Sequence, residues 1–220
     1  MSRPVPEAAP LVGIVLSSAF ALFGFLVSTD HLATILGSVL LLYPFVAFGI
    51  VRSETPEDVF LPDPVLAAGL LGGALVFLYG LVSGKLAFGA FVASVVAVPP
   101  SLYHVRFGES VNPLSPDATL AVGLLGAAAL LIYGATDGLL VGALSAVLVG
   151  LGAVDYRRHR GGPLQRRTRS IAVVCCLGGG LAAFGVLTAT GRPSEGLAAG
   201  SVLVAVGAFL ALGAERQPTR

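Results

Sequence analysis

Few residues of this sequence could carry chemistry, and some of them lie in short polar segments between long apolar ones. Asp30, His31 and Asp137 are the most reactive types in such segments. A histidine with carboxylates can ligate a metal ion or accept protons. The same residues are common in Ser-Thr-Asp and Asp-Gly turns, so we interpret them as turn residues and predict no metal site.

Two further carboxylates, Asp63 and Asp117, occupy matching places just before apolar segments. A carboxylate at the start of a helix accepts hydrogen bonds from backbone N–H groups, and proline suits the first helical position. We therefore expect both to be N-caps, with Pro64 as the first helical residue after Asp63. A cation site would need further ligands that the sequence does not indicate.

Four serines recur at matching places inside apolar segments, and their hydroxyls could line a pore for a small neutral solute. These candidate pore-lining residues are Ser38, Ser94, Ser145 and Ser201. Six residues after the serine, three of the four segments carry a proline or glycine that can kink a helix. The candidate kink positions are Pro44, Pro100 and Gly207. Because kinks are common in membrane helices, inherited fold geometry is the simpler interpretation.

The densest charge in the sequence is a basic cluster between two apolar segments. Such clusters bind anionic lipid headgroups, and they also determine how a membrane protein is oriented. Both interpretations fit together, and neither implies catalysis. The candidate lipid-headgroup residues are Arg157, Arg158, Arg160, Arg166, Arg167 and Arg169.

We expect no catalysis and no cofactor. The sequence contains no His-Glu-x-x-His, no Gly-x-Ser-x-Gly and no phosphate-binding glycine loop. No charged residue lies within the long apolar segments, whereas coupled transporters keep ionisable residues near the membrane midplane. A net charge of +1 gives no electrostatic basis for binding nucleic acid.

The elements that must position these residues are apolar helices. Hydrophobic residues make up 55% of the 220 residues and charged ones 11%, against about 25% charged in a typical soluble domain. Most of the charge-free runs have the roughly 17–25 residues that a membrane-spanning helix needs. The eight runs are Leu11–Val27, Leu32–Val51, Val65–Val82, Leu86–Tyr103, Ala118–Thr136, Leu139–Val154, Ile171–Ala189 and Gly196–Gly213.

The runs fall into pairs, because the connections within each pair are only a few turn residues long. An aromatic–glycine step recurs in the first run of each pair, and its glycines are Gly24, Gly80, Gly134 and Gly185. We therefore predict an all-α, polytopic membrane protein of eight transmembrane helices, arranged as four parallel helical-hairpin repeats. The repeats cover approximately 11–51, 65–104, 118–156 and 170–214 of one membrane domain, 1–220.

Basic residues are distributed unevenly over the connections. Only Lys85 and Arg192, of 13 Lys and Arg, lie in the connections within pairs. The other basic residues lie between pairs or near the termini, which by the positive-inside rule predicts that both termini are cytoplasmic. We expect a multi-pass protein of the cell membrane whose first span is retained.

Arginine outnumbers lysine by twelve to one, and short acidic, proline-containing segments such as Ser53-Glu54-Thr55-Pro56-Glu57-Asp58 separate the spans. In this style the chain resembles small multi-pass membrane proteins of halophilic archaea. The resemblance covers no functional motif and implies no activity.

Two functional classes remain open from the sequence. The first is a structural or accessory membrane protein that packs against a partner membrane protein or against itself, with lipids as its other contacts. The alternative is a passive transporter or channel-like protein for a small neutral solute, lined by the four serines. The absence of charged residues from the interior of the spans favours the structural or accessory class.

Overall fold

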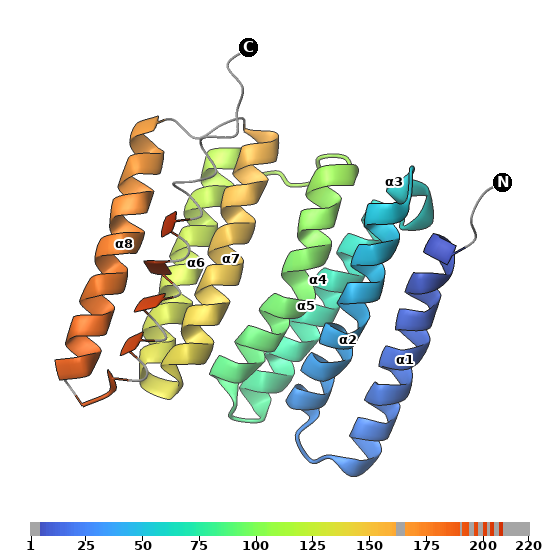
Figure 1. Ribbon diagram of the computed structural model, residues 1–220, viewed down its shortest axis with the longest axis horizontal. Coiled ribbons are helices and arrows are strands. Elements are labelled where there is room, and N and C mark those ends of the chain that lie inside the picture. The colour runs from blue at the N-terminus through green and yellow to red at the C-terminus, as the bar shows by residue number, and fades with distance from the viewer. Residues whose placement is uncertain are drawn as a thin grey trace. The chain divides into compact units, whose positions relative to one another are not determined.

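The computed structural model describes residues 5–161, 166–189, 191–193, 196–197, 200–201, 203–204 and 207–208. Within these residues all regular structure is helical (Figure 1). The chain divides into two compact units, Met1–Asn112 and Pro113–Arg220, and each unit is described by itself. The predicted single membrane domain stays a prediction.

Unit 1 contains four long helices and one short one. Helix α1 packs against α2, α4 packs against α5, and α2 also contacts α5. Leu32 and Val92, with Val76 and Ala93, form the buried centre of this unit. Gly84, with a φ of +70°, makes the tight turn between α4 and α5. The helices are α1 (Val5–Val27), α2 (His31–Arg52), α3 (Pro56–Val59), α4 (Pro62–Val82) and α5 (Leu86–Phe107).

Unit 2 begins with two helices that pack against each other, α6 (Pro116–Asp137) and α7 (Leu139–Arg160). A single residue, Gly138, connects them, so they must run antiparallel. Helix α8 (Arg166–Ala189) follows and covers the seventh predicted span. The eighth predicted span, Gly196–Gly213, lies largely outside the described residues.

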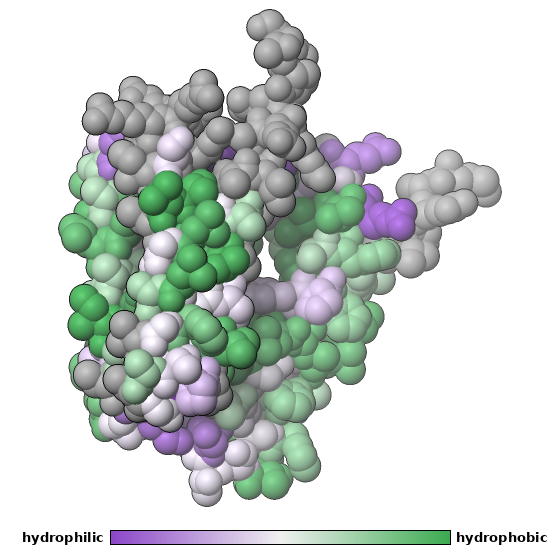
Figure 2. Space-filling model, turned by 60° about the vertical axis from the view of Figure 1, so that its left-hand side comes forward, coloured by the Kyte–Doolittle hydropathy of each residue, from purple (hydrophilic) through white to green (hydrophobic). Residues whose placement is uncertain are grey.

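Six of the described helices are long and apolar enough to cross a membrane. They lie at Ala8–Val27, His31–Arg52, Pro62–Val82, Leu86–Phe107, Pro116–Ala135 and Leu139–Arg160. Large apolar side chains on them are exposed, for example Leu26 at 77% and Leu125 at 71%. Figure 2 shows hydrophobic residues covering the flanks of the helices and hydrophilic ones gathered toward their ends. Such a surface needs lipid around it rather than water.

The predicted N-caps at Asp63 and Asp117 are wrong. The capping residues are Leu61 and Ser115, and only the serine side chain accepts a bond, from the Ala118 N–H. The reason is that each helix starts at the proline before the aspartate, since proline is pre-organised for the first helical position. Each aspartate therefore lies within the first turn.

The candidate kink prolines lie inside uninterrupted helices. Helix α2 continues through Pro44, and α5 continues through both Pro99 and Pro100. The ring of Pro100 lies against Gly69 of α4, where an added Cβ would come within 2.5 Å of the ring. Gly207 is described as helical and buried, and a Cβ there would come within 3.0 Å of Leu177.

Candidate functional site

Close backbone contact through glycine joins the paired helices. An added Cβ at Gly80 would lie 2.6 Å from the Gly89 Cα, so α4 and α5 touch at this point. In unit 2 a Cβ at Gly134 would lie 2.5 Å from the Gly142 Cα, which joins α6 and α7 in the same way. Small residues permit this approach, and packing is what holds helices together in lipid.

Three of the four candidate pore serines are buried and are hydrogen-bonded within their own helices. The hydroxyls of Ser38, Ser94 and Ser145 each donate to the carbonyl oxygen four residues earlier, at 2.8 Å. Their exposed fractions are 9%, 8% and 0%. Ser201 is exposed. These bonds satisfy the donors of the three buried serines without any solute.

Tyr43 supplies a hydrogen bond that α5 cannot make for itself. Its hydroxyl donates to the Val95 carbonyl oxygen at 2.7 Å and lies 3.3 Å from that of Val96. In a regular helix these carbonyls would accept from the N–H groups of residues 99 and 100, but both residues are prolines and have none. Tyr43 therefore links α2 to α5 at the place where α5 has an unfilled acceptor.

Sequence reasoning missed this contact, although a signal for it exists. Two consecutive prolines inside an apolar segment leave two carbonyl groups that must find donors from elsewhere in the protein. Tyr43 is one of few hydroxyl-bearing residues in the neighbouring spans. The Pro-Pro pair therefore indicates that a donor from another helix reaches α5.

Asp63 and Asp117 bind the basic side chains of His104 and Arg157 at the far ends of their partner helices. Asp63 Oδ1 accepts from His104 Nε2 at 2.9 Å, and Asp117 Oδ1 accepts from Arg157 Nε at 2.8 Å. Both carboxylates are exposed, whereas the His104 side chain is only 5% exposed and that of Arg157 13%. Each pair connects the start of one helix to the end of the next, α4 to α5 and α6 to α7.

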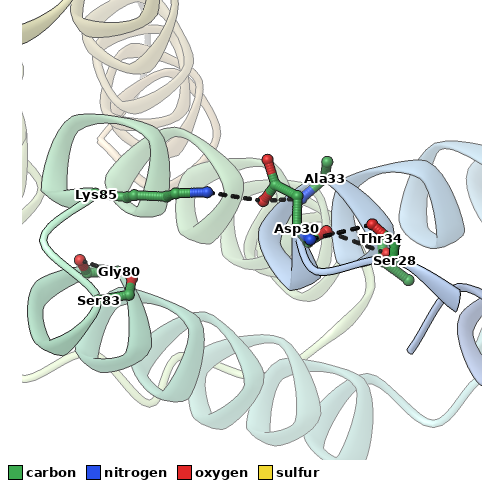
Figure 3. A network of polar contacts seen from close by, with 7 residues as sticks. All are labelled: Ser28, Asp30, Ala33, Thr34, Gly80, Ser83 and Lys85. Atoms are coloured by element: carbon green, nitrogen blue, oxygen red, sulfur yellow. Dashed lines mark hydrogen bonds and ion pairs between the residues drawn. The ribbon is translucent and has the colours of Figure 1, made fainter. Parts of the chain in front are cut away.

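The connection between α1 and α2 is tied to the turn between α4 and α5. Asp30 caps α2 by accepting a bond from the Ala33 N–H, and the same carboxylate lies 3.3 Å from Lys85 Nζ. Figure 3 shows Lys85 reaching across from its turn to Asp30. Turn formation is thus the role that these contacts give Asp30.

His31 packs between two aromatic rings, Phe25 at 5.5 Å and Tyr79 at 6.2 Å between centroids. Its Nδ1 atom is buried, and no hydrogen-bond partner for it is found in the described part of the chain. No group of three His, Cys, Asp or Glu residues in that part could hold a metal ion. Asp137 is the last residue of α6 and belongs to unit 2.

The basic cluster lies at the end of α7 and the start of α8. Arg157, Arg158, His159 and Arg160 form the last turn of α7, and α8 begins at Arg166. His159 Nδ1 lies 3.3 Å from Asp155 Oδ2 and 3.0 Å from the Asp155 carbonyl oxygen. Arg158 is exposed.

The chain matches no protein-family model, no curated protein and no solved structure. Its class therefore follows from its helices and their surfaces: six long apolar helices with lipid-compatible faces make this a helical membrane protein. Its particular role is argued below from the contacts just described.

Proposed function

We propose that this chain is a structural or accessory protein of the cell membrane that acts by helix packing with a partner protein or with a second copy, and not an enzyme. One observation carries this proposal. Hydroxyl groups inside the described spans donate to helix carbonyls in the cases of Tyr43, Ser94 and Ser101, at 2.7–2.8 Å. The exposed faces of the same helices are apolar, so what they offer is packing surface.

The proposal includes eight spans in four parallel hairpin repeats, with both termini cytoplasmic. Close contacts at matching places support the repeat: an added Cβ would clash between Gly24 and Thr34, at Gly80 with Gly89, and at Gly134 with Gly142. The aspartate–histidine pair of the second repeat and the aspartate–arginine pair of the third support it further, because their members are 41 and 40 residues apart. The orientation rests on the distribution of arginine.

The alternative, passive transport of a small neutral solute, has less support. It needs hydroxyls that are available to a solute, and three of the four candidate hydroxyls already donate to their own helices. Substitution of all four serines by alanine should abolish solute flux into liposomes if the alternative is correct. On the accessory proposal it should leave function unchanged.

The experiment that tests the proposal is purification of the tagged, full-length protein from its own membrane in a mild detergent, followed by mass spectrometry. An unrelated tagged protein of similar span number serves as the control. A stoichiometric partner absent from the control supports the accessory role and identifies the complex. A lone monomer that conducts a solute in liposomes, and loses this conduction in the four-serine variant, contradicts it.

A further inference from the structure

The basic cluster is not explained by the contacts that hold the helices together. It comprises Arg157, Arg158, His159, Arg160, Arg166, Arg167 and Arg169. From Tyr156 to Ser194 the sequence contains no aspartate or glutamate. The cluster therefore contains six arginines without any acidic residue between them.

Two carboxylates near this end of unit 2, among the residues that the structure describes, are already engaged. Asp117 binds Arg157 at 2.8 Å, and Asp155 lies 3.3 Å from His159 Nδ1. Neither contact involves Arg158, which is exposed, or the arginines of α8. The six arginines of the cluster therefore outnumber these two described carboxylates.

The two helix ends of the cluster differ in their electrostatic effect on these cations. Cations are favourable at the end of α7, where the helix dipole is negative, but unfavourable at the start of α8, where it is positive. Helices α4 and α6 carry Asp63 and Asp117 in their first turns, whereas the first turn of α8 has no acidic residue. Three arginines at the positive end of a helix favour a bound anion nearby.

We propose that the basic cluster binds the phosphate headgroups of anionic glycerophospholipids. The proposal rests on the chain being a membrane protein and is independent of its accessory role. A cluster located where a long apolar helix ends lies at the level of the lipid phosphates. Guanidinium groups bind phosphate oxygens through paired hydrogen bonds, which makes arginine well suited to this ligand.

The test uses the full-length protein in detergent, titrated with phosphatidylglycerol or phosphatidylcholine, with bound lipids counted by native mass spectrometry. The test variant is Arg158→Gln with Arg167→Gln. The matched control is Arg52→Gln with Arg106→Gln, which removes the same charge from the ends of α2 and α5. If the double variant does not purify as a monodisperse protein, Arg158→Gln alone replaces it.

We expect the preference for phosphatidylglycerol to fall by roughly fivefold per arginine removed from the cluster, and by less than twofold in the control. An unchanged preference in the cluster variant overturns the proposal, as does an equal fall in the control. Competition by millimolar inorganic phosphate would show a site for free anions and would overturn the lipid assignment. A lone monomer that conducts a solute in liposomes would contradict the accessory role and leave this lipid preference intact.

Discussion

The contact between Gly80 and Gly89 gives the sharpest test of the packing described here. In Gly80→Ala the new Cβ would lie 2.6 Å from the Gly89 Cα and 3.4 Å from the Lys85 carbonyl oxygen. Both neighbours are backbone atoms, so no side chain can rotate away, and α4 and α5 must separate. Overpacking of this kind costs about 1–3 kcal/mol, and alanine regains about 0.5–1 kcal/mol of helix propensity. The difference between these ranges is a net loss of up to about 2.5 kcal/mol, with a central value of about 1 kcal/mol.

The assay is unfolding by sodium dodecyl sulfate in mixed micelles, followed by loss of near-ultraviolet circular dichroism. Gly126→Ala is the matched control, because Gly126 also lies inside a helix and nothing lies within 4 Å of its added Cβ. It should be neutral or slightly stabilising. Wild-type stability in Gly80→Ala, or an equal loss in both variants, would refute the argument that close backbone contact joins these helices.

Three further perturbations follow from the polar contacts. Tyr43→Phe should lower the free energy of unfolding by about 0.6–1.7 kcal/mol in the same assay. Adding Pro99→Ala should recover part of this loss, because it restores an N–H donor within α5. Additive losses in the double variant would contradict the pairing of Tyr43 with the proline-containing segment. Asp63→Asn should lower stability less than His104→Ala does, because the asparagine amide oxygen still accepts a hydrogen bond whereas His104→Ala removes a buried ring. Equal losses of stability in thermal unfolding would argue against this reasoning. Asp30→Ala should lower stability by about 1 kcal/mol through the lost cap, and Asp30→Asn should not, as measured by the same thermal melts.

The helices themselves were predictable from the sequence, because apolar runs bounded by turn residues leave little choice of structure. The predicted start at Leu86 agrees with α5. The starts of α4 and α6 were predicted too late, because the N-cap prediction placed Asp63 and Asp117 outside helices that begin at Pro62 and Pro116. The four-residue helix α3 was missed because it is shorter than any periodic signal.

The contacts of the site were less predictable, because they depend on how helices face each other. Nothing local to Asp63 indicates that its partner is His104, 41 residues away along the chain. The predicted pore role of Ser38 assumed an unsatisfied hydroxyl, yet a serine in a helix readily donates to the carbonyl four residues earlier. The Pro99-Pro100 pair was a signal that an external donor such as Tyr43 was needed.

The glycine contacts also have a consequence for how the chain folds. Gly80 and Gly89, like Gly134 and Gly142, lie close together in the sequence, so each helix pair can close with little loss of chain entropy. The Tyr43 bond instead joins residues 52 apart and needs two completed pairs. We expect the pairs to form one after another as the chain is synthesised, and the Tyr43 hydroxyl to find Val95 only afterwards. Its formation would then mark the step from separate pairs to the assembled first unit.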